Sequence, residues 1–477
     1  MILQILSLIR SLLFFAAFFA ASILPQPTYV EGVTEQPTGF VPVATSNDID
    51  RTVQKIIYRS LFKYDVTGTI IPDLADYWEV SADGLTYTVR IKASQRWQDG
   101  KSLSANDIIY TASNSRELTG VATDRLDSRT VRFTLPNKFS PFYDLLTIPV
   151  LPAHLEGHND KWLPVGSSNY RVIRVDRDRG LIKDVILQGN SPSLAITRVE
   201  FKFYDSEKDL ETAAKLGEVN AFSEKEDQFS YNNYTKISIP EKNRYYALFF
   251  NTRDKKLADV SVRAKLASGL SVSGILKNVF GDNFVATTGP LSLNKFARGD
   301  LDYAAPDSKK LELPKELRLA IVGNSVNIKI ANEVSAAWKL LSVKVKINVY
   351  TIEQFNSEVI GKRDFDVLLF GQEVSSDPDR YVLWHSSQAN FPGLNLSGIA
   401  NSRIDKALEE GRKEKAADIR QKHYSIFQKA VMDEVPAIFL YHPIFNYYVR
   451  DNLNGLDLKN FSLPSDRFLS LSNWGFK

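Results

Sequence analysis

The sequence predicts an α/β protein that is built from at least two lobes. It has 477 residues, whereas a single hydrophobic core rarely grows past about 250–300 residues. Three strand-like apolar runs occur at 317–322, 343–350 and 365–370, and a helical pattern at 326–341 lies between the first two. Such alternation is typical of a sheet that is covered by helices. We therefore expect one α/β lobe in the second half of the chain and another lobe before it.

Residues 58–110 predict a smaller α+β unit. Two short strands, 78–80 and 85–91, flank a hairpin loop at 81–84, and a helix begins near Asp107. A helix at 48–62 is expected just before this unit, with Asn47 or Asp48 as its cap. Its apolar spacing ends near Tyr64, where a turn containing Gly68 follows.

The order of residues in 58–110 resembles the extracytoplasmic solute-binding proteins of peptide ABC importers, the dipeptide- and oligopeptide-binding family (solute-binding protein family 5). A second resemblance starts at Asp377-Pro378-Asp379 and runs through His385-Ser386-Ser387-Gln388. The resemblance extends from about residue 29 to the C-terminus. The matching residues of the first stretch include Pro72, Asp73, Leu74, Ala75, Trp78, Asp83, Gly84, Tyr87, Trp97, Asp99 and Gly100.

The resemblance implies a fold and a division of the chain. The expected fold is the bilobal periplasmic-binding-protein (type II) α/β fold, with an extra α+β subdomain inserted in the first lobe. Lobe I would combine residues 29–57, 163–250 and 449–477, with the insertion at 58–162, and lobe II would cover 251–448. The chain would cross between the lobes near Phe250-Asn251 and within 441–449, and these crossings would form the hinge.

The resemblance also implies a function. The protein is expected to be the substrate-binding component of an ABC importer, which binds peptides or a similar small solute between its lobes. Hinge closure would then present the ligand to a membrane permease and its ATPase. The expected protein is a monomer without a cofactor. The alternatives are a solute-sensing ectodomain on the same fold, or a carrier of a nickel chelate, haem or an oligosaccharide.

The resemblance further implies the ligand contacts. In the family's peptide binders, an Asp a few residues before the Asp-Pro turn pairs with the α-ammonium of the peptide, and that Asp is absent here. Glu373 is the nearest acid, four positions before Asp377, so it either binds the ammonium group or is merely solvated. The residues expected to contact ligand are Thr38, Gly39, Phe40, Tyr170, Asn251, Gly371, Gln372, Glu373, Tyr381, Trp384 and His385.

The N-terminal segment, residues 1–28, predicts export. Residues 11–24 carry no charge after Arg10, and small side chains at 20–22 offer a possible signal-peptide cleavage point. Residues 1–24 are also long enough to span a membrane as an uncleaved anchor. The absence of cysteine excludes disulfides and the lipidated cysteine of many family members, which favours the anchor. The expected location is extracytoplasmic, either anchored to the outer face of the cytoplasmic membrane or periplasmic.

Other functional classes find less support. The net charge is +3 with dispersed basic residues, so no nucleic-acid partner is expected. His385 beside Ser386, with acids nearby, suggests a hydrolase triad, but no nucleophile-elbow motif occurs. His154 and His158 suggest a metal site, yet Gly157 lies between them and argues against the rigid helix that such a pair needs. We therefore expect neither catalytic nor metal-ligating residues.

Overall fold

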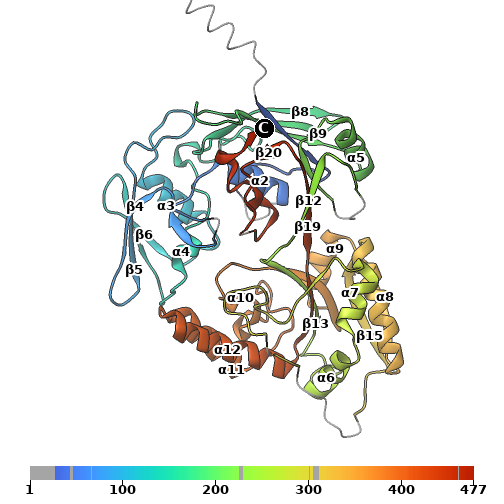
Figure 1. Cartoon of the computed structure of the whole chain (residues 1–477). Coiled ribbons are helices and arrows are strands. Elements are labelled where there is room, and N and C mark those ends of the chain that lie inside the picture. The colour runs from blue at the N-terminus through green and yellow to red at the C-terminus, as the bar shows by residue number, and fades with distance from the viewer. Residues whose placement is uncertain are drawn as a thin grey trace, which may run out of the picture.

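The computed structural model describes residues 27–42, 47–65, 67–224, 229–299, 301–303, 311–459 and 461–477. Three bodies are visible: an upper lobe, a lower lobe, and a smaller subdomain at the side of the upper lobe (Figure 1). Each is built around its own sheet, with seven, six and four strands respectively among the described residues. We call them lobe I, lobe II and the inserted subdomain.

Lobe I is a mixed sheet with the strand order β12-β19-β11-β1-β10-β9-β8. β1 pairs in parallel with both β10 and β11, and the other neighbours are antiparallel. Helix α2 begins after a capping box formed by Asn47 and Asp50, which explains its start. The elements are β1 (Thr28–Val33), α2 (Asp48–Ile57), β8 (Tyr170–Asp178), β9 (Leu181–Gly189), β10 (Arg198–Phe203), α5 (Glu207–Leu216), β11 (Ala221–Glu224), β12 (Tyr234–Pro240), β19 (Ile444–Arg450), β20 (Leu453–Asn454) and β21 (Gly475–Phe476), with short 3₁₀ helices at Pro464–Phe468 and Leu471–Asn473.

The inserted subdomain is an antiparallel sheet with the order β4-β5-β7-β6. Its buried apolar residues, such as Leu61 and Phe133, form one continuous cluster with Tyr29 and Val53 of lobe I. We infer that the subdomain moves with lobe I as one body, because a shared close-packed core resists separation. Its elements are β2 (Phe62–Tyr64), β3 (Ile70–Pro72), β4 (Ala75–Val80), β5 (Thr86–Ile91), α3 (Ala105–Ser113), β6 (Ala122–Arg125), β7 (Thr130–Thr134), α4 (Phe142–Leu145) and a 3₁₀ turn at Ala153–Leu155.

Lobe II is a sheet with helices on both faces. Along β13, Tyr245 and Phe249 pack into the cluster with α11 and α12, whereas Leu248 and Phe250 pack into the cluster with α6 to α8. Burial on both faces explains the continuous apolar run of this strand. The elements are β13 (Arg244–Phe250), α6 (Val260–Ser268), α7 (Val272–Phe280), β14 (Val285–Ala286), β15 (Glu316–Val322), α8 (Ser325–Leu340), β16 (Lys344–Tyr350), α9 (Ile352–Gln354), a π-helix (Phe355–Ile360), β17 (Val367–Glu373), α10 (Tyr381–Trp384), a 3₁₀ turn (Ser386–Gln388), α11 (Ser402–Lys413), α12 (Ala417–Glu434) and β18 (Ala437–His442).

The chain crosses between the lobes at two adjacent places. The first crossing is 241–243, between β12 of lobe I and β13 of lobe II, and the second is Pro443, between β18 and β19. The backbone N–H of Glu241 donates to the carbonyl oxygen of Pro443 at 2.8 Å, so the two crossings are tied together. The crossing predicted near Phe250-Asn251 is wrong, because β13 pairs with β17 and β18. The second crossing falls inside the predicted range of 441–449.

The helix predicted at 48–62 is shorter in the structure and ends at Ile57. Tyr58 is extended, and Phe62–Tyr64 forms β2, which pairs with β3. The guanidinium group of Arg59 binds the Asp73 carboxylate at 2.8 Å, and Leu61 and Phe62 are buried in the core of the subdomain. Tertiary contacts therefore override the helical periodicity that these apolar residues would otherwise support.

The predicted N-terminal leader falls on residues 1–28, of which 1–26 lie outside the described residues. Within the part of the chain that the structure describes, we find no helix with the length and apolar character that a membrane span requires.

Candidate ligand-binding site between the lobes

A cluster of five charged residues joins the lobes beside the crossings, and we call it the hinge-side cluster. It consists of Asp48 and Arg51 on α2, Glu241 and Arg244 at the first crossing, and Glu373 at the end of β17. Arg51 donates to Asp48 at 2.6 Å and to Glu373 at 3.0 Å. Arg244 binds Asp48 at 3.0 Å, Glu241 at 2.8 Å and Glu373 at 3.0 Å. Every carboxylate of the cluster therefore has a guanidinium partner.

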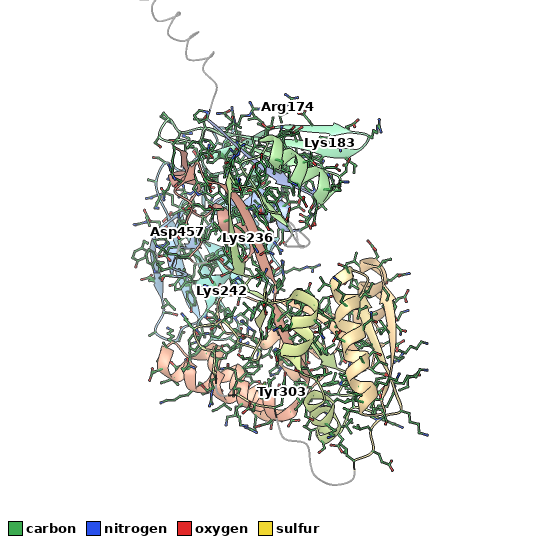
Figure 2. All side chains as sticks on the ribbon, turned by 45° about the vertical axis from the view of Figure 1, so that its right-hand side comes forward. Arg174, Lys183, Lys236, Lys242, Tyr303 and Asp457 are labelled. Carbon is green, nitrogen blue, oxygen red and sulfur yellow. The ribbon has the colours of Figure 1, made fainter. Side chains whose placement is uncertain are left out.

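The arginines of this cluster control its charge. Burial opposes ionisation of Asp48, but Arg244 and Arg51 hold the pKa of Asp48 below its usual value. Burial raises the pKa of Glu241 to about 7 in spite of Arg244. Lys242, the next residue along the chain, lies where the lobes meet, whereas Arg174 and Lys183 lie far from this junction on the outer part of lobe I (Figure 2).

Segment 373–377 of lobe II contacts the first crossing at Glu373 and Ser376. After Glu373, the amide of Asn243 donates to the Ser376 hydroxyl at 2.9 Å. Two contacts anchor the following Asp-Pro-Asp turn to lobe II: Arg420 binds the Asp377 carboxylate at 2.8 Å, and Arg412 binds Asp379 at 2.8 Å. The buried guanidinium of Arg380 donates to the carbonyl oxygens of Pro290, Ser375, Asp377 and Asp379. The motif therefore holds segment 373–377 in place against the helices of lobe II.

A second contact joins the inserted subdomain to lobe II, and we call it the subdomain-side contact. The backbone N–H of Ser140 donates to the carbonyl oxygen of Arg412 at 2.7 Å. The Arg412 guanidinium lies 4.8 Å from the ring centroid of Phe139 and 4.2 Å from that of Tyr381. A cavity of about 240 Å³ lies beside it, lined by residues from 82–87 and 138–140 of the subdomain and 413–415 of lobe II. The two bodies are thus in contact at both edges of their boundary.

Asp144 on α4 also belongs to the subdomain-side contact. The Tyr64 hydroxyl donates to its carboxyl group. Burial and, to a smaller extent, the charge of Asp377 of lobe II raise the pKa of Asp144 to about 7, against the opposing effects of Arg420 and Lys295. A carboxyl group with such a perturbed pKa at an interlobe boundary is a candidate functional group.

Several predicted ligand contacts have side chains that pack inside the protein. Phe40, Tyr170 and Trp384 are buried, with exposed fractions of 0%, 3% and 1%. Gln372 is also buried and accepts a hydrogen bond from the Tyr245 hydroxyl. These side chains present no free surface to a ligand in this arrangement, so their predicted contact with ligand stays a prediction.

The other predicted contacts are spread over the boundary and beyond it. The backbone N–H groups of Thr38 and Gly39 donate to the Asp50 carboxylate at 2.9 and 3.3 Å, which fastens their loop to α2. Gly371 faces the ring of Tyr246, and a Cβ there would lie 2.8 Å from it. Asn251 follows β13 at the end of the sheet remote from the crossings and donates to the Phe365 carbonyl.

Tyr381 and His385 stack at the subdomain-side contact. Their ring centroids are 4.0 Å apart, and the Arg412 guanidinium lies 4.2 Å from the centroid of the Tyr381 ring. His385 itself is bound to the Ser387 hydroxyl at 2.8 Å and to Glu409 at 3.2 Å. The structure therefore brings these two predicted residues together, but separates them from Glu373 in the hinge-side cluster.

The described residues form neither the Ser386–His385 pair that the hydrolase alternative needs nor the ligand group that the metal alternative needs. The Ser386 hydroxyl donates to the Asp405 carboxylate at 2.5 Å, while His385 binds the Ser387 hydroxyl at 2.8 Å, so the suggested pair of Ser386 with His385 is not formed. His154 binds Asp99 at 2.7 Å, and His158 is exposed. Over the described ranges, no group of three or more His, Asp or Glu residues could hold a metal ion.

Sequence reasoning missed Arg51, Arg244, Asp144, Arg412 and Arg420. A signal existed for Arg51, because Asp48, Arg51 and Lys55 share one face of α2 at helical spacing. Each of the other four makes at least one contact with a residue that is distant in the sequence, as Arg420 does with Asp377. Only the folded chain brings such charges together.

Two sheet-based lobes joined by two adjacent crossings, with charged groups of both lobes facing each other, define a bilobal binding protein. Comparison with known proteins agrees. Residues 69–392 match the family described as bacterial extracellular solute-binding proteins, family 5 Middle. The chain belongs to this family, and its fold is the predicted bilobal α/β fold with an inserted subdomain.

Individual relatives span almost the whole chain. The oligopeptide-binding protein AppA of Bacillus subtilis (strain 168) is 24% identical over 488 residues, which cover 89% of this chain and 88% of AppA. The solved structure of the ABC transporter substrate-binding protein CtaP from Listeria monocytogenes has a TM-score of 0.81 and 22% identity, covering 94% of this chain and 99% of CtaP. The structure of B. subtilis AppA in complex with a nonapeptide has a TM-score of 0.77 and 21% identity, covering 95% and 100% of the two chains.

Proposed function

We propose that the protein is the extracytoplasmic substrate-binding component of an ABC importer, and that it binds peptides between lobe I and lobe II. The family match over residues 69–392 carries this proposal, and the names of AppA and its nonapeptide complex support a peptide as the ligand. The ligand stabilises the closed form because it binds this form more tightly than the open form. A permease and its ATPase would receive the closed complex.

Hinge bending is the proposed movement. The crossings 241–243 and Pro443 are the places where the chain passes between the two sheets, and a few residues at such crossings can absorb the backbone change of domain closure. The continuous core of lobe I and the inserted subdomain makes these two one of the moving bodies. Lobe II, with its own two apolar clusters, is the other.

Two measurements on residues 27–477 test binding and closure. Native mass spectrometry should detect co-purified or added peptides on the protein. Small-angle scattering should show a smaller radius of gyration with a peptide mixture than without it, when the ligand-free protein is open. Measurable binding of a haem, a nickel chelate or an oligosaccharide, together with no binding of any peptide, would reject the peptide assignment.

Three finer statements belong to the same proposal. The protein is a binder without catalytic activity, in line with the diversion of the Ser386 hydroxyl to Asp405. It acts as a monomer. It is held at the outer face of the cytoplasmic membrane by residues 1–24, because the chain has no cysteine for a lipid. Intact-mass measurement of the native protein tests the attachment: a chain that begins near Ile23 would show cleavage and release.

A further inference from the structure

The carboxyl group of Asp144 has no cationic partner, in contrast to Asp377, Asp379 and the carboxylates of the hinge-side cluster. Among the described residues Asp144 forms no ion pair, and its side chain receives one hydrogen bond, from the hydroxyl group of Tyr64. It lies on α4 of the inserted subdomain and feels three groups of lobe II, namely Asp377, Arg420 and Lys295. A partly buried carboxylate without a counter-charge is costly.

Neither of the two cations of lobe II near Asp144 forms an ion pair with its carboxyl group. Arg420 uses both terminal nitrogens on Asp377, at 2.9 and 2.8 Å, and its Nε donates to the carbonyl oxygen of Gly411. Lys295 lies over the ring of Phe296, with its Nζ 5.6 Å from the centroid. Both lower the pKa of Asp144, but burial and Asp377 outweigh them. The carboxyl group of Asp144 therefore has no ion-pair partner among the described residues.

Glu373 is in the opposite situation. Arg51 and Arg244 each bind one of its two carboxylate oxygens at 3.0 Å. A ligand cation would have to displace or share these guanidinium groups, whereas at Asp144 it would supply the missing charge. The ammonium role that the sequence suggests for Glu373 is thus better met by the geometry around Asp144.

We propose that Asp144 is the residue that receives the ammonium group of the ligand, at the boundary between the inserted subdomain and lobe II. This inference rests on the proposed peptide function. An ammonium group carries three donors and would form a short charge-assisted hydrogen bond with the carboxylate, while the Tyr64 hydroxyl keeps the carboxylate oriented. Because Asp144 belongs to the body formed with lobe I and faces lobe II, a ligand held there bridges the two moving bodies.

Alanine peptides of two to nine residues, each with a free and an N-acetylated amino end, are the probe for titration calorimetry with residues 27–477. The parent protein should bind the free peptide at least about thirtyfold more tightly than its acetylated form, the loss typical of removing one partner of a buried charge pair. Asp144→Asn should abolish this preference, and Asp282→Asn, a control whose carboxylate is 94% exposed, should keep it. Retention of the preference in Asp144→Asn would overturn the inference.

The same peptides with one Lys inserted distinguish the two sources of an ammonium group. Restored binding of an acetylated, Lys-containing peptide by the parent protein, and its loss in Asp144→Asn, would assign the site to side-chain ammonium groups rather than to the amino end. Equal binding of all acetylated and free peptides would overturn the inference and leave the peptide function standing. Absence of binding by every peptide would instead reject the function on which it rests.

The pH dependence separates ligand recognition from a closing latch. If the carboxylate binds an ammonium group, protons compete with the ligand, so affinity for the free peptide should rise between pH 5 and pH 7. If Asp144 only closes against lobe II in its protonated form, affinity should fall over this range, for acetylated peptides as well. A fall would overturn the inference. The groups facing Asp144 are Tyr64, Asp377, Arg420 and Lys295. Lys295→Gln tests a second way of closing the lobes, in which Lys295 and Asp144 form an ion pair. Equal weakening of the binding of all peptides would support this ion pair and contradict ammonium binding.

Discussion

The hinge-side cluster and the subdomain-side contact both join lobe II to the rest of the protein, but they treat charge differently. In the hinge-side cluster two arginines serve three carboxylates, and each carboxylate has a guanidinium nitrogen within 3.0 Å. At the subdomain-side contact, Asp377 and Asp379 are bound by Arg420 and Arg412, while Asp144 has only a phenol hydroxyl.

This difference indicates at which contact the charge of a bound ligand would stabilise the protein. A compensated cluster holds two bodies together without outside help, although each exposed pair contributes little. An uncompensated carboxyl group makes its surroundings less stable when ionised and becomes favourable once a cation arrives. The hinge-side cluster therefore suits a positioning role, and the subdomain-side contact suits recognition. The following predictions test this division, from the largest expected effect to the smallest.

Replacing Arg244 by Met should have the largest effect. It leaves Asp48, Glu241 and Glu373 with one guanidinium among them, and the side chain of Glu241 is only 8% exposed. Breaking a buried pair typically costs about 3–5 kcal/mol, and partial solvent exposure of the cluster reduces this to about 2–3 kcal/mol. Urea denaturation measures the change. The control Arg174→Met removes an exposed ion pair with Asp176 and should lower the unfolding free energy by less than about 0.5 kcal/mol. If the two variants lose the same unfolding free energy, Arg244 does not compensate the carboxylates of the hinge-side cluster.

Replacing Asp144 by Asn should stabilise the ligand-free protein at neutral pH. The folded pKa of about 7 lies above the ordinary aspartate pKa of 3.8, so the folded state binds the proton more tightly. The stability contribution of the protonated carboxyl group is complete below about pH 4 and is lost as pH rises through 7. After a discount for solvent screening, Asp144→Asn should gain about 2 kcal/mol over the parent at pH 8 and nothing at pH 4.

Denaturation at both pH values checks this prediction. Asp282→Asn is the matched control, because its carboxylate is 94% exposed. A parent protein whose stability relative to Asp144→Asn is the same at pH 4 and pH 8 would contradict the idea that Asp144 is uncompensated.

Replacing Arg412 by Lys should weaken closure more than stability. The planar guanidinium contacts the rings of Phe139 and Tyr381 and binds Asp379, and an ammonium group reproduces such stacking poorly. The expected loss is about 1 kcal/mol, which is roughly a fivefold decrease in peptide affinity. Calorimetry measures it, with the exposed Arg403→Lys as the control. Unchanged affinity would show that, at the subdomain-side contact, peptide binding depends on Asp144 and its neighbours and not on the contacts of Arg412.

Replacing Glu373 by Gln should have the smallest effect. Its ion pair with Arg51 joins side chains that are 30% and 38% exposed, and such pairs contribute about 0–1 kcal/mol. The unfolding free energy should therefore change by less than about 1 kcal/mol, and the change should shrink in 1 M salt, where the Debye length is about 3 Å. A loss of unfolding free energy as large as that of Arg244→Met would show that Glu373, rather than Arg244, contributes most to the stability of the cluster.

The sequence alone determined the bilobal class and most of the elements. Helical and strand periodicities located α8, β15 and β16, and the residue order at 58–110 and 377–388 indicated the family that the comparison confirms. These features depend on patterns within a few turns of helix or a single strand, which local physics controls. The role of Asp377 and Asp379 as a loop anchor was not visible, because Arg420 and Arg412 lie on helices further along the chain.

Tertiary structure decided the crossings and the distribution of charge. A continuous apolar strand at 244–250 is compatible with either lobe, and only its pairing with β17 and β18 placed it in lobe II. The apolar residues after Ile57 continue a helical pattern, but packing in the subdomain core makes Phe62–Tyr64 a strand. Whether a carboxylate is compensated depends on guanidinium groups that approach it from distant segments. Sequence spacing therefore singled out Glu373, and the folded arrangement of charges singled out Asp144.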